Sequence, residues 1–194
     1  MSTGDAAVDG VVDTPRLRLR PVHEGHAEAT ARLMTPALSR WLASWPSPIT
    51  TAAVAARIAS IREAIAAGRT LCFAIERRDD GAMMGWVWIA PSQHHPARGN
   101  MGYWLGEPFQ QHGYMTEAAR ATLLAGFARL DLTAIEAGAQ PGNEASLRIM
   151  RKLGMRPIGV RSIWASARGR EELCEYYEIT RGACTASGTA GSRR

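Results

Sequence analysis

The sequence predicts an α/β domain in which a mixed β-sheet carries helices on its faces. Its 194 residues, 46% hydrophobic and 21% charged, suit one globular domain rather than a disordered chain. Runs of alternating apolar residues and runs with apolar residues three or four apart follow one another along the chain, as strands and helices do. No stretch approaches the roughly 20 apolar residues of a membrane helix, so no membrane partner is expected.

The first half of the chain predicts one strand, three helices and a hairpin. Leu17 and Leu19 alternate with arginines, as in a strand with one solvent-exposed face. Thr35 and Pro36 have the residue types of an N-cap and a first helical position. Residues 77–81 have the composition of a turn between two apolar runs. The elements expected here are a strand at 17–20, helices at 24–34, 36–45 and 51–67, and antiparallel strands at 71–76 and 83–90.

The second half predicts strands that alternate with helices and then a final strand pair. Apolar residues three or four apart predict the strongest helix between 115 and 130. Asn143 has the residue type of an N-cap, and Gly154 ends the helix that follows it. The elements expected here are strands at 100–106, 134–139, 155–164 and 173–181, and helices at 115–130 and 143–153. The predicted order is β-α-α-α-β-β-β-α-β-α-β-β, in a single domain at 14–182 between flexible tails at 1–13 and 183–194.

A net charge of +5 would attract phosphates, an acidic partner or an acidic substrate. Of the 23 basic residues only Lys152 is a lysine, and the arginines are scattered along the chain without a basic run. Neither a zinc-finger spacing nor an aromatic RNA-binding signature accompanies them. Nucleic-acid binding is therefore not expected.

The three cysteines indicate the compartment. Cys72, Cys174 and Cys184 are odd in number and far apart, which favours free thiols over a disulfide framework. The first residues also lack the basic and apolar regions of a secretory signal. We expect a cytoplasmic protein.

Several familiar motifs are absent or incomplete. His23 and His26 are three residues apart, whereas a zincin helix carries its histidines four apart, and no third ligand is near in the sequence. His94 and His95 have no cysteine or carboxylate at ligand spacing, so no metal site is predicted. The chain has no P-loop, no G-x-G-x-x-G after a strand, no G-x-S-x-G and no C-x-x-C.

Two segments remain that can carry chemistry. Residues 106–118 lie between a strand and the start of the longest helix, where free backbone N–H groups and the helix dipole bind phosphates. Gly113 lets the backbone approach an anion closely, although an ordinary turn capped by Thr116 fits this segment as well. Residues 143–155 place Ser146 in the first turn of a helix, which alone is only a capped amphipathic helix.

Together, and in this order, the two segments resemble the GNAT superfamily of N-acetyltransferases, and in particular its Rim-type branch. The first is similar to the pyrophosphate loop P-x-x-Q-G-x-G-Y-x-T-E-A, and the second to the helix N-x-x-S…K-x-G-[FM]. The resemblance extends over about 15–181 and includes T-P-R-L-x-L-R-P at the start and Y-E-I-T-R at the end. One position departs from it, because Gln111 stands where the loop has its first glycine.

This resemblance implies a GNAT fold, with a mixed, mostly antiparallel sheet of six to seven strands flanked by helices. It implies that acetyl-CoA lies where the strand ending at Leu105 separates from the strand at 134–139. The pantetheine arm would pair with the backbone of the first strand, and the N–H groups of 111–116 would hold the pyrophosphate. The residues implied in binding acetyl-CoA are Tyr103, Trp104, Leu105, Gln110, Gln111, His112, Gly113, Tyr114, Met115, Thr116, Asn143 and Ser146.

The implied reaction is direct attack of a primary amine on the thioester in a ternary complex. Met150 occupies the position where many members have a proton-donating tyrosine, so Ser146 is the candidate acid, unless it only touches the cofactor. Glu175 is the candidate base, since it shares strand parity with the apolar residues Leu173, Tyr177 and Ile179, which points it toward the covered face. An exposed or arginine-paired Glu175 is an alternative, and water can take the proton of an α-amine with a pKa near ~8.

The acceptor stays open between a protein N-terminal α-amine and a small amine. Trp41 and Trp45 are expected on the acceptor side, although buried aromatics are more often core. The resemblance also allows a homodimer. The competing interpretation is a CoA-binding or acyl-CoA-binding module without turnover, suggested by Gln111, by Met150 and by the lack of a carboxylate between 164 and 170.

Overall fold

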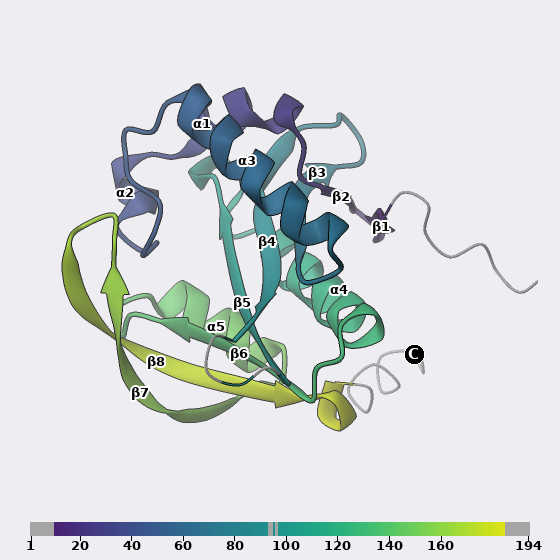
Figure 1. Ribbon diagram of the computed structural model, residues 1–194, viewed down its shortest axis with the longest axis vertical. Coiled ribbons are helices and arrows are strands. Elements are labelled where there is room, and N and C mark those ends of the chain that lie inside the picture. Colours follow the sequence, from purple (N-terminus) through teal and green to yellow (C-terminus); the bar gives the residue numbers. More distant parts are fainter. Residues whose placement is uncertain (1–9, 93–94, 96, 185–194) are drawn as a thin grey trace, which may run out of the picture.

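The computed structural model describes residues 10–92, 95 and 97–184, which form one eight-stranded sheet with helices on both faces (Figure 1). The strands are β1 (Val12–Asp13), β2 (Leu17–Pro21), β3 (Leu71–Arg77), β4 (Met83–Pro91), β5 (Arg98–Leu105), β6 (Ala134–Ala139), β7 (Arg156–Ala165) and β8 (Arg170–Thr180). The helices are α1 (Ala27–Leu33), α2 (Pro36–Ser39), α3 (Thr51–Ala66), α4 (Tyr114–Arg129) and α5 (Glu144–Lys152), with 3-10 turns η1 (Glu24–His26) and η2 (Glu107–Phe109).

The sheet order is β1-β2-β3-β4-β5-β6-β8-β7, and every neighbouring pair is antiparallel except β5 with β6. The predicted mixed, mostly antiparallel sheet flanked by helices is therefore confirmed, and its predicted elements occur in the predicted order. The eighth strand is β1, whose Val12 pairs with Leu19 of β2. A two-residue strand is too short to show alternation, so the sequence pattern could not reveal it.

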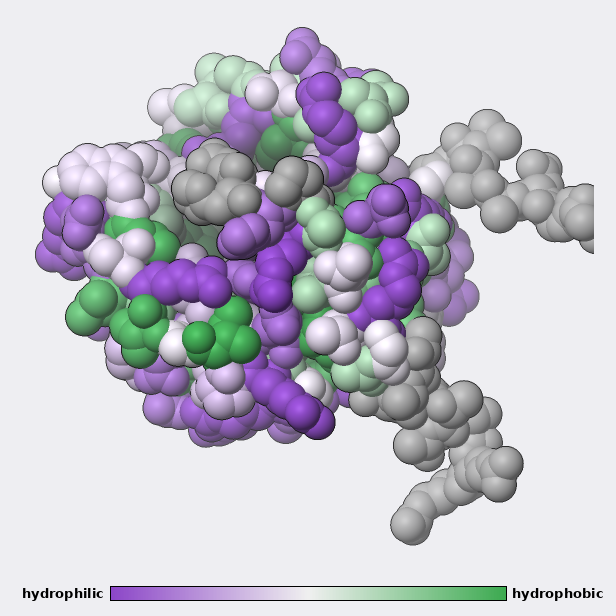
Figure 2. Space-filling view, turned by 60° about the horizontal axis from the view of Figure 1, so that its bottom comes forward, coloured by the Kyte–Doolittle hydropathy of each residue, from purple (hydrophilic) through white to green (hydrophobic). Residues whose placement is uncertain are grey.

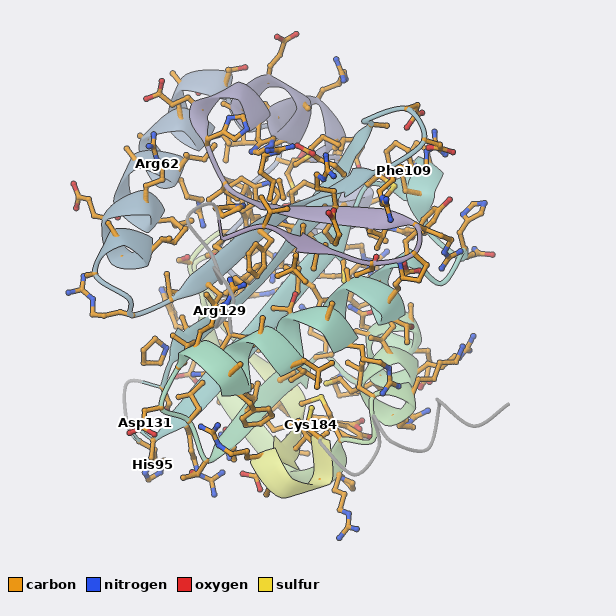
Figure 3. All side chains as sticks on the ribbon, turned by 90° about the vertical axis from the view of Figure 1, so that its right-hand side faces the viewer. Arg62, His95, Phe109, Arg129, Asp131 and Cys184 are labelled. Carbon is orange, nitrogen blue, oxygen red and sulfur yellow. The ribbon has the colours of Figure 1, made fainter. Side chains whose placement is uncertain are left out.

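Two segments that the sequence assigns to tails belong in part to the folded domain. Residues 12 and 13 form β1, and the Asp13 carboxylate pairs with Arg18 at 2.9 Å. Cys184 is buried in the core beneath α4 (Figure 3). The remaining residues of the two predicted tails, 1–9 and 185–194, lie outside the described residues, as does His94.

The helix expected at 36–45 is shorter than predicted. It begins as expected, with the Thr35 hydroxyl accepting the N–H of Leu38 at 3.2 Å, but it ends at Ser39. Pro46 disfavours helical backbone at the residue before it, and Trp45 is buried in the core, only 3% exposed. The segment that follows α2 is therefore an irregular one that carries Trp41 and Trp45 toward the sheet.

Each face of the sheet has its own hydrophobic core. One core lies under α4 and α5 and includes Leu19, Leu123, Ile135 and Leu147. The other lies under α1 and α3 and is built around three tryptophans, Trp45, Trp86 and Trp104. Within the described residues, no helix is long and apolar enough to cross a membrane.

Candidate active site

β5 and β6 are parallel neighbours that separate after three paired residues. Arg98–Asn100 pair with Ala134–Glu136, and beyond this point β5 stays with β4 while β6 stays with β8. The two strands diverge toward Leu105 and Ala139. A cleft of about 220 Å³ opens at this place, as predicted for the two strands.

Aromatic rings and glycines shape one side of the cleft. The Trp88 ring lies across Gly102 of β5, where a Cβ would come within 2.1 Å of it. The Tyr176 ring lies across Gly138 of β6 in the same way, where a Cβ would come within 2.8 Å. Both rings line the cleft, so the two glycines are needed for the rings to lie flat against the diverging strands.

The loop before α4 has the backbone of an anion-binding site. Gly113 is the N-cap of α4 with φ +79°, and it gives the helix no side-chain cap. The first intrahelical bond runs from the N–H of Glu117 to the carbonyl of Gly113, so the N–H groups of Tyr114, Met115 and Thr116 precede it. Phe109 in η2 and Asp131 mark opposite ends of α4 in Figure 3.

Gln111 adopts the conformation that glycine favours. Its φ is +66°, and among the described residues it is the one non-glycine residue with a positive φ. The backbone route of the loop therefore survives the replacement of glycine by glutamine, at a cost in strain. Gln110 holds the loop to the end of β5, because its side-chain amide nitrogen, Nε2, donates to the carbonyl of Leu105 at 2.9 Å.

Arg16 braces this loop, a role that the sequence analysis did not assign. Its Nη1 donates to the carbonyl of His112 at 3.0 Å, and its guanidinium pairs with Glu117 at 2.7 Å. The same guanidinium lies 4.6 Å from the centre of the Tyr114 ring. The sequence feature that could have indicated this role is the T-P-R-L motif near the start of the chain, whose arginine is Arg16.

The structure brings Ser146 to Tyr103 at the inner end of the cleft. The Tyr103 hydroxyl lies 3.0 Å from Ser146 Oγ and 3.3 Å from the Ser146 carbonyl oxygen. Burial raises the pKa of Tyr103 to about 12, partly offset by its bond to Ser146, so the phenol keeps its proton at neutral pH. Asn143 caps α5 by accepting the N–H of Ser146 at 3.2 Å, and Met150 is fully buried in the core.

Comparison with protein-family models identifies the family of this chain. The model of the acetyltransferase (GNAT) domain matches residues 16–156, which is more than half of the chain. The chain belongs to the GNAT acetyltransferase family.

Individual relatives agree with this assignment. The chain is 41% identical over 75 residues to the uncharacterized N-acetyltransferase YnaD of Bacillus subtilis (strain 168), a match of 38% of this chain and 44% of YnaD. The chain spans about half the length of the first curated relatives that it matches. These sequence matches are therefore partial.

Solved GNAT structures match over most of the chain. The Mycobacterium smegmatis RimJ structure, in complex with CoA-disulfide, has a TM-score of 0.76 at 24% identity over 90% of this chain and 89% of that one. RimL, described as a ribosomal L7/L12 alpha-N-protein acetyltransferase in complex with coenzyme A, has a TM-score of 0.76 at 20% identity over 89% of this chain and 99% of that one. At these identities the likeness shows the shared GNAT fold.

Glu175 does not line the GNAT cleft, contrary to its expected place. It pairs with Ala139, and its side of β8 is the one on which Tyr177 and Ile179 face α4 and α5. Glu175 shares its face of β8 with buried Tyr177 and Ile179, but Leu173 on the same face is 61% exposed, and the residues of β8 that line the cleft have the opposite parity. These are Glu172, Cys174 and Tyr176.

Among the described residues, Glu172 is the carboxylate that lines the cleft, and neighbouring side chains hold both of its oxygens. It pairs with Arg168 at 2.6 Å and Arg170 at 2.9 Å, and it accepts Gln140 Nε2 at 2.7 Å. The hydrogen bond from Arg168 is the main cause that lowers the pKa of Glu172 to about 2. A carboxylate held in this way is a weak base, so Glu172 suits a structural role.

The side of the cleft on which the acceptor is expected is formed by the segment after α2 and the turn between β7 and β8. Trp41 lines the cleft and carries Arg40 over its ring at 4.5 Å. Trp45 also lines the cleft, although its ring packs edge-on against Trp86 at 5.1 Å and is nearly buried. Both expected tryptophans therefore lie beside the cleft, and Trp45 is a core residue as well.

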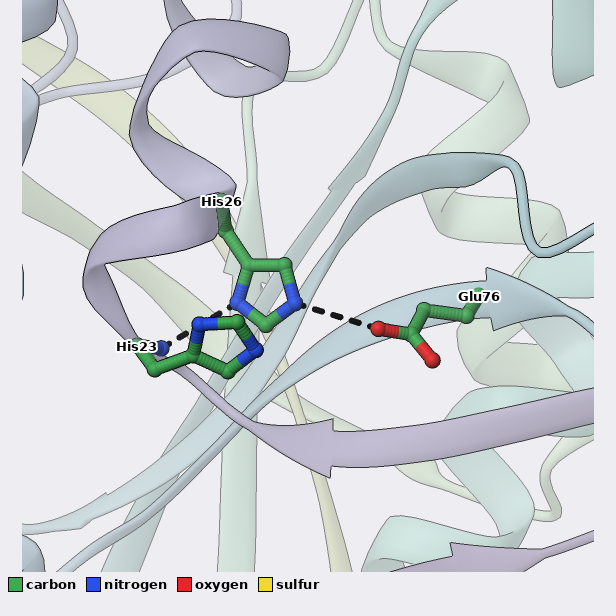
Figure 4. A group of neighbouring side chains, drawn as sticks. All are labelled: His23, His26 and Glu76. Atoms are coloured by element: carbon green, nitrogen blue, oxygen red, sulfur yellow. Dashed lines mark hydrogen bonds and ion pairs between the residues drawn. The ribbon is translucent and has the colours of Figure 1, made fainter.

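One group of side chains outside the cleft has the composition of a metal site: His23, His26 and Glu76 (Figure 4). His26 Nδ1 accepts the N–H of His23 at 3.1 Å, and His23 Nδ1 accepts the N–H of Gly25 at 3.2 Å. Each ring therefore carries its proton on Nε2, and His26 Nε2 donates to Glu76 at 3.1 Å. A metal would need these Nε2 atoms unprotonated, with the protons moved onto the Nδ1 atoms that cap η1. The donor set does not fit a metal without breaking both caps.

Proposed function

We propose that this chain is an acetyl-CoA-dependent N-acetyltransferase that moves the acetyl group to a primary amine in a ternary complex. The observation that carries the proposal is the cleft between β5 and β6, which Tyr103 and Ser146 line, together with the loop before α4, which Gln110 holds to Leu105 at the end of β5. The free N–H groups before α4 suit a pyrophosphate, and the unpaired edge of β5 suits an amide-containing arm. Membership of the GNAT family supports the same assignment.

Acetyl-CoA supplies the activated thioester, and the residues of the chain supply positioning and a proton. The N–H groups of 111–116 bind the diphosphate, and the Asn143 amide N–H group contacts the arm while its oxygen caps α5. Ser146, hydrogen-bonded to Tyr103, donates a proton to the departing thiolate. The amine nitrogen forms the new C–N bond as the C–S bond breaks.

The proton of the attacking amine passes to water in this proposal. Glu172 is held by two arginines with a pKa of about 2, and Glu175 lies on the other side of β8. An α-amine with a pKa near ~8 is partly neutral at physiological pH, so it needs no strong base. A protein N-terminal α-amine and a small α-amine both meet this condition, and the ribosomal-protein acetyltransferases among the similar structures favour the first.

A homodimer is supported by an exposed apolar surface on the outer strand pair. Val160, Trp164 and Leu173 of β7 and β8 are 59%, 63% and 61% exposed, and hydrophobic side chains gather on this side of the molecule in Figure 2. β7 is also an edge strand, with one row of backbone groups free to pair. Light scattering should show a dimer that Val160→Asp dissociates, and a monomeric wild type would refute this.

The three buried free cysteines fit a reducing cytoplasm.

Calorimetric titration of acetyl-CoA, followed by a free-thiol assay with N-terminal peptides and small amines, tests the proposal. Binding together with thiol release that depends on an acceptor is the expected result. Binding without thiol release for any amine would favour the non-catalytic CoA-binding module. Absence of binding would show that the side chain of Gln111 closes the diphosphate site, and the proposal would fail.

A further inference from the structure

A second cavity, of about 390 Å³, lies between α3 and the strands β3 and β4. Small side chains of α3, Ser60 and Ala64, face Trp86 and Trp88 of β4 across it. Because small residues face a sheet that carries bulky rings, the helix leaves space that side chains do not fill. Its size falls within the range of pockets that bind small molecules, roughly 300–1,000 Å³.

Arg57 of α3 places a positive charge in this cavity. Its guanidinium lies 4.4 Å from the centre of the Trp45 ring, and its Nη2 donates to the carbonyl of Ser44 at 2.6 Å. Burial lowers the pKa of Arg57, and no acidic residue of the described part of the chain pairs with it or lines the cavity. A guanidinium has five N–H donors, and this one uses two of its three nitrogens on Ser44 alone.

The second cavity adjoins the proposed transfer site. Ser44, Trp45 and Trp88 line both the cleft and this cavity, so a molecule that enters beside Trp88 has both within reach. Arg69 also lines the cavity and adds a second positive charge. A molecule spanning the two spaces would place its amine in the cleft and its other end among the tryptophans and Arg57.

We propose that this cavity is an acceptor subsite, which takes the apolar or aromatic body of the amine and binds a carboxylate of the same molecule through Arg57. This assignment rests on the proposed transferase function for the identity of the amine, but the binding site itself does not. The tryptophan rings provide apolar contact area, and the arginine fork matches the two oxygens of a carboxylate. The preferred acceptors are amines that carry a remote negative charge.

The test uses glycyl-phenylalanine, its glycine-extended homologues and their C-terminal amides as probes. Each pair keeps the α-amine and the ring and differs only in the carboxylate. Calorimetry with and without CoA measures binding, and the free-thiol assay measures transfer. We expect at least one free acid to bind about tenfold more tightly than its amide, as a charged hydrogen bond contributes this order of free energy.

Arg57→Met should reduce the acid-to-amide ratio to about one while leaving binding of the amide within about twofold. Arg62→Met is the matched control, since Arg62 lies on the exposed side of α3 and does not line the cavity (Figure 3). Its ratio should equal that of the wild type. Ala64→Phe fills the cavity with Arg57 in place and should weaken binding of both acid and amide.

The outcomes separate this inference from the proposed function. Equal binding of acids and amides to the wild type, or a preference that persists in Arg57→Met, overturns the subsite even if transfer occurs. A preference that Arg57→Met removes, without thiol release for any amine, supports the subsite and refutes the transferase. The wild-type ratio decides the question if a variant does not fold.

Discussion

At the scale of single residues, the loop before α4 depends on two positions with a left-handed backbone, and only one of them is glycine. Gln111 has φ +66° and Gly113 has φ +79°. A non-glycine residue in this region is less favourable than glycine by roughly 1–2 kcal/mol. The chain therefore carries local strain at the place where the loop would meet a diphosphate, and this strain can be measured.

Gln111→Gly is expected to raise the free energy of unfolding by up to about 1 kcal/mol, because it relieves the strain, and Gly113→Ala to lower it by about 1 kcal/mol. A Cβ on Gly113 would meet Arg16 Nη2 at 3.6 Å, an ordinary contact, so the cost there comes from the backbone. Urea denaturation of the three proteins measures both effects. A Gln111→Gly variant less stable than the wild type would show that contacts of the glutamine side chain outweigh the strain.

The two hydroxyls at the inner end of the cleft give a second prediction at this scale. Ser146→Ala should lower kcat about a hundredfold, the order that a general acid contributes. Tyr103→Phe keeps Ser146 but removes the partner of its hydroxyl, and should lower kcat about tenfold with KM for acetyl-CoA nearly unchanged. Steady-state kinetics of both variants and of the double variant provide the measurement.

The double variant distinguishes a shared role from two separate ones. If Tyr103 acts through Ser146, removing both hydroxyls costs no more than removing Ser146 alone. Costs that multiply would mean that Tyr103 acts on its own, for instance on the thioester. Wild-type kcat in Ser146→Ala would contradict the assignment of the acid.

At the scale of elements, the turn between β7 and β8 is fastened to the segment after α2. Arg168 donates to the carbonyls of Ser39 and Leu42 at 2.9 and 3.1 Å while it pairs with Glu172. The N–H of Ala167 also bonds the carbonyl of Ala43 at 2.9 Å. These contacts join the two segments that form the proposed acceptor side of the cleft.

Arg168→Ala is expected to raise KM for the acceptor about tenfold, because the turn loses its contacts with the segment that carries Trp41. Binding of acetyl-CoA should stay unchanged, since the Arg168 side chain makes its hydrogen bonds with Ser39, Leu42 and Glu172 and none with the described loop before α4. Arg170→Ala is the matched control: it removes a second arginine from Glu172, but its side chain is 68% exposed. A similar KM in the two variants would contradict this role.

The elements themselves were predictable from the sequence where local periodicity decides them. Helix α4 and the strands β3, β4 and β6 follow from patterns of neighbouring residues, and Thr35 and Asn143 cap the helices expected of them. The short strand β1 was not predictable in this way, because its hydrogen bonds depend on where β2 lies. The early end of α2 depends likewise on burial of Trp45.

At the scale of the whole molecule, the site forms where elements from distant parts of the sequence meet. Sequence motifs located the loop before α4 and Ser146. The alternation of residues along β8 showed which residues share a face with Glu175, but it did not show that the cleft lies on the other face of β8. Arg16 reaches its loop across 96 residues of sequence, and Arg57 reaches Trp45 from a different element. Such contacts follow from topology, which a single sequence read locally does not contain.

The coupling of η1 to β3 through His26 predicts how the stability of the whole domain depends on pH. Burial is the main cause that lowers the pKa of His26, and the nearby Arg20 and His23 act in the same direction, while the bond to Glu76 opposes it. The folded state therefore binds fewer protons than the unfolded state below the unfolded pKa of about 6.5. Stability is fully present above that pH and decreases as the pH falls below it, by at most about 1.4 kcal/mol per pH unit.

Urea denaturation between about pH 8 and pH 5 tests this in the wild type and in His26→Gln, which cannot titrate at this position. The wild type should lose more stability than His26→Gln as the pH falls, and His95→Gln, which replaces an exposed histidine at the far end of the domain, should behave like the wild type (Figure 3). A protonated His26 cannot accept the N–H of His23 at Nδ1. The loss of stability should therefore be accompanied by opening of η1. Identical pH dependence in the wild type and His26→Gln would show that His26 keeps its unfolded pKa in the folded domain.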